Sequence, residues 1–261
     1  MTFLQLGALE FEKLLFVVLR VGGIMTVAPV FGHRNIPKML KISIIFIISI
    51  VILPTVPSLP VNLPSDLFSL IGILAKEVTA GLLIGFTSLL LFFAVQFGGN
   101  IIGLQMGFGI VNVIDPNSSA HVPIIGQFQF LLAILIFLAI DGHHLVLSAV
   151  INSFQAIPLG QINFSKLSAE IIVRAGVDTL ASAIKLSAPC IVTLFLVDVA
   201  MGIVARTVPQ MNIFIVGFPL KISIGLVMLG ISFPFVGYVF TKLLQGLNAD
   251  LDYLIMAMRP V

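Results

Sequence analysis

The sequence has few charged residues, a single cysteine and almost no net charge. Charged side chains make up 9% of its 261 residues and apolar ones 59%, whereas soluble proteins are about 25% charged. This composition predicts an integral membrane protein. Because Cys190 is the one cysteine, an internal disulfide is excluded, and its apolar neighbours indicate a small packing residue. The net charge of +2 is too small and too scattered to favour a nucleic-acid partner.

Motifs of catalysis are also missing. The sequence contains no HExxH pair, nucleophile elbow, phosphate loop or dinucleotide fingerprint. Asp141, His143 and His144 form the one group that resembles a metal or catalytic cluster. Adjacent residues of a helix point about 100° apart, so the two histidines do not share a face, and we interpret the group as a hydrogen-bonded turn. We therefore expect no enzyme activity, no metal and no cofactor.

Long apolar runs predict an all-α membrane protein of helical hairpins with broken and re-entrant helices. The first run, residues 14–31, carries Arg20 near its middle. An arginine at this depth needs a partner, and we expect a carboxylate or the carbonyls of a helix end to meet it inside the bundle. Arg34, Lys38 and Lys41 follow in the most basic segment, which the positive-inside rule predicts to be cytoplasmic.

Two apolar runs are short for a membrane crossing. Residues 42–56 would form only about 22 Å of helix. Residues 124–140 and 145–157 flank a sharp turn, and we expect a helical hairpin whose second leg is too short to cross. Counting every run as a crossing would place basic residues on both sides of the membrane, so one of the short runs is expected not to span.

The run over residues 67–97 is long enough but contains two adjacent charges, Lys76 and Glu77. These side chains point apart on a helix and therefore need other partners. We expect both at the rim of a span that begins after Glu77. Gly81 and Gly85 are predicted to form a packing face of small residues on this helix.

Charged residues of the second half lie within long apolar patterns. A polar stripe, expected to face water or other subunits, consists of Glu170, Arg174, Asp178, Ser182 and Lys185. Asp198 stands alone among apolar neighbours, and Arg206 follows on nearly the same helix face. Residues 208–212 are predicted to break the helix. The amphipathic tail, residues 241–258, is expected to lie on a partner or at the membrane interface.

The stretch over residues 98–123 interrupts the apolar pattern with glycines and turn residues. Gly99, Gly103 and Gly107 recur every four residues, so on a helix they would let another backbone approach closely. Beyond Gly107 the helical pattern ends, yet the residues remain too apolar for a solvated loop. Such a backbone at membrane depth must be buried in protein or line a cavity. A segment that closes a pore and a packed loop that never moves are the two interpretations.

Several short motifs, taken in order, resemble the FliR family of flagellar biosynthetic proteins, whose injectisome counterpart is SctT. The resemblance covers essentially the whole chain. The motifs are Arg20 with Pro29, Phe31 and Pro37; GLQMG at residues 103–107; Asp115-Pro116; AIDGHH at residues 139–144; and Arg206, Pro209, Gln210, Asn212 and Phe214, followed by Pro219 and Lys221. Residues from Glu170 onward also resemble the small hairpin subunit FliQ.

The resemblance implies a non-enzymatic subunit of the type III export gate, a helical assembly that passes unfolded polypeptides through the bacterial inner membrane. Homologues of FliP and FliQ would share the assembly, with a FlhB homologue on its cytoplasmic side. Residues 1–165 would form a FliP-like hairpin region, and residues 166–261 a FliQ-like hairpin with a C-terminal tail. The whole would be one structural unit without an independent soluble domain, in contact with membrane lipid and not with nucleic acid.

Two sets of site residues are predicted. The resemblance implies a plug that closes the channel, formed by Gln105, Met106, Gly107, Phe108, Gly109, Ile110, Val113, Ile114 and Asp115, with aliphatic residues at positions 110, 113 and 114 where the family has aromatic ones. Contacts that register neighbouring helices or subunits are expected from Arg20, Glu77, Asp198, Arg206, Pro209, Gln210, Asn212 and Lys221.

Other functions remain as alternatives at this point. An injectisome subunit of the SctT type differs least from the flagellar hypothesis, and the AIDGHH motif favours the flagellum. A stand-alone secondary transporter would use Arg20, Glu77 and Asp198 as coupling groups at the membrane midplane, but the sequence lacks a convincing inverted repeat. An intramembrane enzyme built on the Asp-His-His group comes third.

Overall fold

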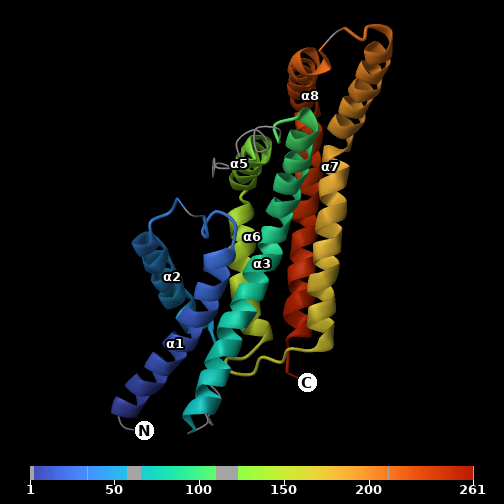
Figure 1. The fold of residues 1–261 in the computed structure, drawn as a ribbon. Coiled ribbons are helices and arrows are strands. Elements are labelled where there is room, and N and C mark those ends of the chain that lie inside the picture. The colour runs from blue at the N-terminus through green and yellow to red at the C-terminus, as the bar shows by residue number, and fades with distance from the viewer. Residues whose placement is uncertain (1–2, 34, 58–65, 110–122, 211, 261) are drawn as a thin grey trace. The chain divides into compact units, whose positions relative to one another are not determined.

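The computed structural model describes residues 3–33, 35–57, 66–109, 123–210 and 212–260. Every regular element in these ranges is helical, which confirms the predicted all-α fold (Figure 1). The helices are α1 (Phe3–Val27), α2 (Lys38–Ile52), the short 3-10 helix η1 (Leu53–Thr55), α3 (Leu67–Met106), α5 (Ile124–Ala139), α6 (Gly142–Ala156), α7 (Lys166–Thr207) and α8 (Ile213–Ala257).

Four helical segments in the described part of the chain are long and apolar enough to cross a membrane. They are Lys38–Thr55, Leu67–Met106, Lys166–Thr207 and Ile215–Ala257. The pair α5 and α6 would add a fifth if it counts as one broken span. α6 alone has 15 residues, which agrees with the prediction that this leg is too short to cross by itself.

The first helix differs in its bounds from the apolar run over residues 14–31. α1 begins at Phe3 and ends at Val27. Besides Arg20, the helix carries Glu10, Glu12 and Lys13 in the part that precedes residue 14. The helix thus begins earlier and ends earlier than the apolar run in the sequence.

The second helix is longer than predicted. α2 begins at Lys38, before the expected residue 42, because Pro37 is compatible with the position that precedes a first helical turn. The helix continues through η1, and the combined segment reaches 18 residues with a mean hydropathy of 2.0. The run was predicted to be too short for a crossing. The helical segment is long enough to cross, so this prediction is wrong.

α3 passes unbroken through both of its charged residues. Lys76 is exposed, whereas Glu77 has no exposed surface. The helix begins at Leu67 and not after Glu77. The prediction that both charges lie at the rim of a shorter span is therefore wrong for Glu77, whose carboxylate is enclosed by protein.

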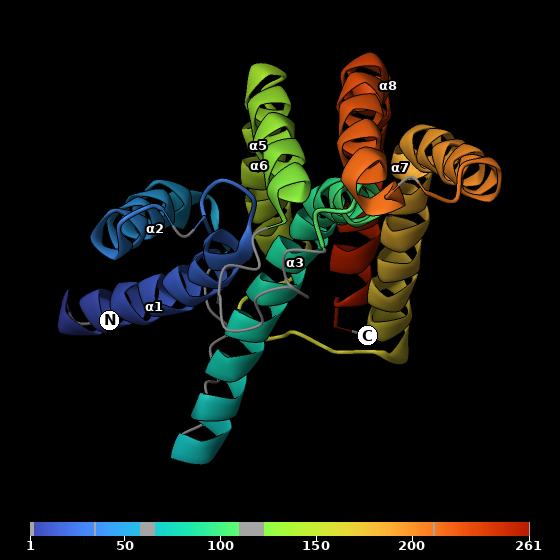
Figure 2. The same cartoon turned by 45° about the horizontal axis from the view of Figure 1, so that its top comes forward.

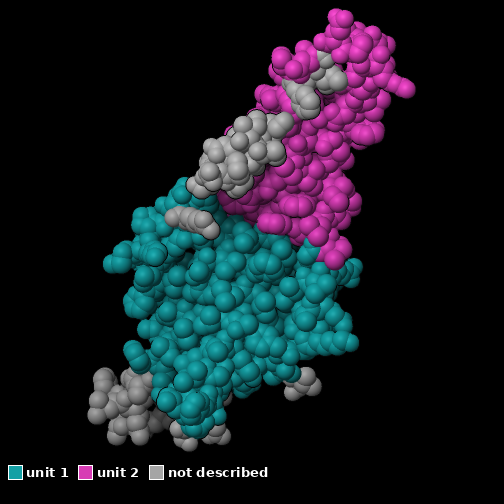
Figure 3. All heavy atoms as spheres, in the orientation of Figure 1, with its two compact units in different colours: residues 1–90, 138–176, 244–261 teal, residues 91–137, 177–243 magenta. Residues whose placement is uncertain are grey.

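The chain divides into two compact units (Figure 3). Unit 1 consists of residues 1–90, 138–176 and 244–261, and unit 2 of residues 91–137 and 177–243. Because α3, α5, α7 and α8 each contribute residues to both units, no unit is a continuous piece of the chain. The predicted division between residues 165 and 166 stays a prediction.

Unit 1 is built on close contact between α1 and α3. A Cβ atom placed on Gly81 would collide with the carbonyl oxygen of Arg20 and lie 3.1 Å from the Cα of Gly23. One placed on Gly85 would lie 2.5 Å from the carbonyl oxygen of Ile24. The two backbones touch along this line, which confirms the predicted packing face of small residues.

The C-terminal part of α8 also lies in unit 1. Its buried apolar residues are Leu244, Leu247, Leu251, Leu254 and Ile255, and Met258, just after the helix ends, is buried with them. The backbone N–H of Asn163 donates a hydrogen bond of 3.1 Å to the carbonyl of Met258, and the Ser165 hydroxyl donates one of 3.0 Å to that of Ala257. The prediction that the amphipathic face lies on a partner or at the membrane interface is therefore wrong, because this chain itself covers it.

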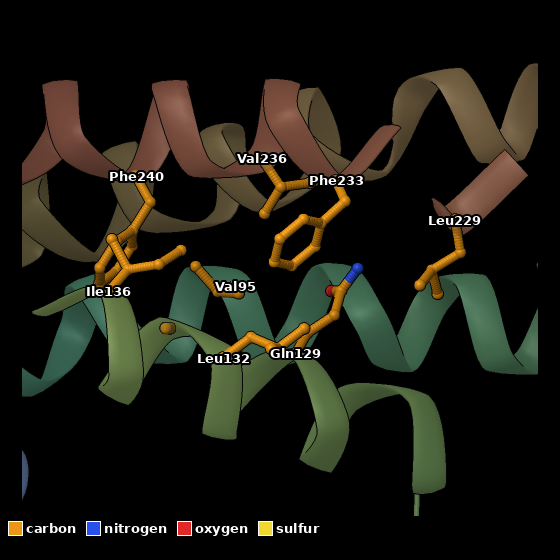
Figure 4. Close-up of a pocket in the computed structure, with 9 residues that line it drawn as sticks. Val95, Gln129, Leu132, Ile136, Leu229, Phe233, Val236 and Phe240 are labelled. Atoms are coloured by element: carbon orange, nitrogen blue, oxygen red, sulfur yellow. The ribbon is translucent and has the colours of Figure 1, made fainter. Parts of the chain in front are cut away.

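The core of unit 2 contains a cluster of aromatic rings. Phe92 makes edge-on contacts with Phe130, Phe137 and Phe240, at centroid distances of 6.1, 5.1 and 5.4 Å. Edge-on pairs of this kind contribute about 0.5–1.5 kcal/mol each beyond the area they bury. An apolar pocket beside the cluster receives the polar side chain of Gln129, which is 7% exposed and comes from α5 (Figure 4).

Within unit 2, α7 and α8 run antiparallel and side by side (Figures 1 and 2). The Cys190 sulfur lies 3.5 Å from the Ser232 hydroxyl, and the Asp198 carboxylate contacts Lys221 farther along the same pair. Cys190 is fully buried, as expected for a small packing residue. The helices are separated at residues 208–212, which confirms the predicted break.

Candidate functional site

The predicted partner of Arg20 is a carboxylate or a helix end, and the structure provides both. Its Nε donates to Glu77 Oε2 at 2.6 Å and its Nη2 to Glu77 Oε1 at 3.1 Å. Its Nη1 donates to the carbonyls of Ser153 and Ile157, at 2.9 and 3.0 Å, where α6 ends. The guanidinium also lies 4.6 Å from the ring centroid of Phe154. Arg20 therefore joins α1, α3 and α6 within unit 1.

Glu77 receives a further hydrogen bond from the loop after α6. The Gly160 N–H donates to Glu77 Oε1 at 2.7 Å, with Gly160 at a φ of +75°. Both charges have no exposed surface, and breaking a buried pair of this kind leaves an uncompensated charge in protein. The contact of Arg20 and Glu77 with other subunits stays a prediction. Because unit 1 encloses both side chains, they can influence a partner only through the shape of this unit.

The predicted plug begins where α3 ends, and the end of the helix has a defined geometry. Gly107 has a φ of +96°. Its N–H donates to the Leu104 carbonyl at 3.0 Å, and the Phe108 N–H donates to the Gly103 carbonyl at 3.1 Å. These two bonds form a Schellman motif, in which the residue with positive φ is normally glycine. The chain thus leaves α3 at the glycine where the sequence pattern predicts the helix to fail.

The start of this segment is packed against α8 in unit 2. A Cβ atom on Gly107 would lie 2.6 Å from the ring of Phe218. Met106 is fully buried, and its side chain covers Gly225, where a Cβ would lie 2.7 Å from it. The surrounding core consists of Ile102, Met106, Ile125, Cys190, Leu194 and Leu229, with Phe108, Ile222 and Met228 packed against it. Phe218 and Gly225 were not predicted to contact this segment, although their spacing of seven residues places them on one helix face.

The structure describes only some of the other predicted plug residues. Gln105, Phe108 and Gly109 are half-buried. Ile110, Val113, Ile114 and Asp115 lie outside the described residues. Among the three glycines spaced by four, Gly99 makes the close backbone approach, since a Cβ there would lie 2.7 Å from the Cα of Gly126.

Two of the predicted contact residues meet each other. Asp198 on α7 and Lys221 on α8 form an ion pair with a distance of 2.7 Å between Oδ1 and Nζ. The side chains are 42% and 17% exposed, respectively, so water screens this pair more than it screens Arg20 and Glu77. The pair fixes α7 against α8 inside unit 2. Contact of either residue with another subunit stays a prediction.

The residues at the break between α7 and α8 are open to the surroundings. Arg206, Pro209, Gln210 and Asn212 are all exposed. Asn212 has a local structural function, because its Oδ1 accepts a hydrogen bond of 3.4 Å from the N–H of Ile215 and thus caps the first turn of α8. The predicted role of these residues in subunit contact stays a prediction.

The Asp-His-His group lies at a hydrogen-bonded turn, as predicted, since the Asp141 N–H donates to the Leu138 carbonyl at 3.2 Å and the His144 N–H to the Asp141 carbonyl at 2.9 Å. Asp141 precedes the first residue of α6 and has a φ of +56°. The rings of His143 and His144 lie with their centroids 4.3 Å apart. One possible ligand atom from each of the three side chains lies within 4.8 Å of the others. The three side chains are thus near one another at the turn, although the two histidines are consecutive residues of the helix.

Comparisons with known proteins agree with the resemblance in the sequence. The family described as bacterial export proteins, family 1, matches residues 11–247. The flagellar biosynthetic protein FliR of Bacillus subtilis (strain 168) is 39% identical over 222 residues, which cover 84% of this chain and 85% of that protein. FliR of Escherichia coli (strain K12) is 30% identical over 84% of this chain and 83% of its own length. FliR of Aquifex aeolicus (strain VF5) is 27% identical over 94% and 95%.

Proposed function

Because this chain belongs to the FliR family of bacterial export proteins, we propose that it forms the flagellar type III export channel together with homologues of FliP and FliQ. The observation that carries the proposal is the family match over residues 11–247, which includes all the predicted contact residues and the whole glycine-rich segment. As a member of the family, the chain is a membrane-embedded component of flagellar protein export. The bacterial inner membrane is the proposed location, with a FlhB homologue on its cytoplasmic side.

The surfaces of α7 and α8 support an assembly with other subunits. Large apolar side chains are exposed along both helices, including Phe195, Leu196, Ile203, Leu226 and Ile231. Lipid tails could cover these groups, but they could not satisfy the polar groups on the same helices. Helices from FliP and FliQ homologues would offer hydrogen-bond partners to the exposed residues at the break between α7 and α8.

The glycine-rich segment is the proposed plug of the channel. A pore wide enough for an unfolded polypeptide would leak ions at rest, whereas an apolar constriction excludes ions because they cannot shed their water there. Phe108, Ile110, Val113 and Ile114 would supply the apolar surface. Gly107, with its positive φ at the end of α3, allows the chain to change direction there without unfolding the helix.

The decisive experiment places a charge in the proposed constriction. Ile110→Asp should leave the complex assembled and raise small-ion leakage through the membrane, because a carboxylate holds water in the pore. Ile110→Leu is the matched control and should leave the leakage at the wild-type level. An assembled Ile110→Asp complex with unchanged conductance would refute the plug assignment.

A genetic test addresses the export function separately from the plug. A strain that lacks this chain should fail to export flagellin and should regain export when the wild-type gene is supplied. Full flagellin export without the chain would contradict the proposed function. An injectisome role predicts instead that flagellin export continues and that secretion through an injectisome is lost.

A further inference from the structure

We propose that Asp141, His143 and His144 form a binding site for a divalent transition-metal ion of the Zn²⁺ class. The site lies outside the glycine-rich segment, and the proposal does not depend on the export function. One ligand atom from each side chain lies within 4.8 Å of the other two. Atoms bound to one Zn²⁺ at about 2.0–2.2 Å stand about 3.4 Å apart in a tetrahedral arrangement. Side-chain rotation can close the difference, because Asp141 and His144 are exposed.

The backbone brings these three side chains together. Asp141 adopts a left-handed conformation with φ +56° and ψ +28°, which aspartate tolerates better than most residues. The His144 N–H donates a hydrogen bond of 2.9 Å to the Asp141 carbonyl, so the chain turns sharply between them. The histidines then occupy consecutive positions in the first turn of α6, with ring centroids 4.3 Å apart. The three side chains therefore lie close together at the start of α6.

Two polar groups of the cluster lack the partners that their positions would normally give them. Aspartate before a first helical turn usually accepts a hydrogen bond from a backbone N–H of that turn, but the Asp141 side chain makes no such bond. The Nδ1 atom of His143 is buried and has no hydrogen-bond partner among the described residues. Buried polar atoms without a partner are rare because they are costly. A metal ion would use the carboxylate and the imidazole nitrogens as ligands.

The donor set decides the class of ion. Two imidazole nitrogens with one carboxylate suit Zn²⁺ and its neighbours Co²⁺, Ni²⁺ and Cu²⁺. Mg²⁺ and Ca²⁺ prefer sites made of oxygen atoms. The N-terminal end of α6 repels a cation through its macrodipole, and the negative charge of Asp141 offsets this repulsion. Three protein ligands would leave a fourth position for water or for a group from another subunit.

The location also requires a partner for these groups. They lie at the break between α5 and α6, a pair that could form one broken membrane span. Lipid cannot satisfy polar side chains at such a break. A bound ion would neutralise Asp141 and hold the histidines in place, which would fix the start of α6.

The test is metal binding by the intact membrane complex, purified through a tag that contains no histidine. Titration with Co²⁺ should produce the visible absorption bands of a site with nitrogen and oxygen ligands, and Zn²⁺ should abolish them at about one ion per chain. His143→Ala and His144→Ala should each weaken Zn²⁺ binding at least tenfold, and Asp141→Asn should weaken it in the same direction. His33→Ala is the matched control and should bind as the wild type does.

Each outcome decides the proposal. Equal Zn²⁺ binding by wild type and by a variant lacking all three side chains would overturn it, as would the absence of Co²⁺ bands in an intact wild-type complex. If a variant does not assemble, the wild-type complex loaded with Cu²⁺ supplies the answer through electron paramagnetic resonance. Magnetic coupling to imidazole nitrogens that persists when both His33 and His121 are replaced by alanine would support the site, and a spectrum without nitrogen coupling would refute it.

Discussion

Replacing Glu77 by glutamine tests the buried contact that joins three helices of unit 1. The carboxylate meets the Arg20 guanidinium through hydrogen bonds of 2.6 and 3.1 Å and accepts a third of 2.7 Å from Gly160 N–H. Glutamine has nearly the same shape and keeps one oxygen as an acceptor. It removes the negative charge, however, and its N–H₂ group then faces an N–H of Arg20 or Gly160, which is itself a donor. Removing one partner of a buried pair costs about 3–5 kcal/mol, because the remaining charge is left unpaired in protein.

The exposed pair of Lys166 and Glu170 provides the matched control. Its atoms lie 3.7 Å apart and its side chains are 92% and 62% exposed. Water screens such pairs, so Glu170→Gln should cost less than about 1 kcal/mol. The assay is the unfolding free energy of the purified chain in mixed micelles with increasing denaturing detergent. A difference of about 3 kcal/mol corresponds to a factor of more than one hundred in the folded-to-unfolded ratio.

A double variant separates the charge from the packing. Arg20→Met combined with Glu77→Leu removes both charges and should be more stable than the sum of the two single losses predicts. Part of the loss should remain, because the carbonyls of Ser153 and Ile157 lose their donor. Equal costs for Glu77→Gln and Glu170→Gln would refute the reasoning, since burial would then have no effect on the value of the pair.

Three further substitutions test separate contacts. Gly81→Leu should separate α1 from α3 and lower the yield of folded chain in the membrane, whereas Gly72→Ala, with no atom within 4 Å of the new Cβ, should leave the yield unchanged. Asp198→Asn should reduce recovery of the assembled complex by freeing Lys221 from its partner on α7, and normal recovery with loss only of proton-driven export would contradict this role. Gly107→Val should destabilise the end of α3 by about 1–3 kcal/mol, because valine is strained at the φ of +96° that Gly107 adopts. The measurement is the rate of proteolysis near residue 107, which should rise, and a rate equal to that of the wild type would contradict the prediction.

Properties that depend on local sequence were predictable. The composition indicates a membrane protein and the long continuous apolar runs indicate helices, because a helix satisfies all of its backbone hydrogen bonds within one segment. A helix end at Gly107 and a break at residues 208–212 follow from local groups of glycine, proline and asparagine, which have a low helix propensity. The need of Arg20 for a partner follows from the cost of an isolated charge in an apolar environment.

The identity of that partner was decided by tertiary structure. Glu77 is 57 positions from Arg20, and the Ser153 carbonyl is 133 positions away. No periodicity links residues at such separations, because packing between helices and not the helical repeat brings them together. For the same reason two predictions from the sequence were wrong. They placed Glu77 at the rim of a membrane span and the amphipathic tail on a partner or at the membrane interface.

Local conformation also decided how near the Asp-His-His side chains lie to one another. On a regular helix His143 and His144 diverge, but the left-handed Asp141 starts α6 in a way that gathers all three side chains. The sequence by itself determined which residues need partners, since that need is a matter of hydration and charge. Tertiary structure determined which partners they have, since only the packed chain fixes the distances between them.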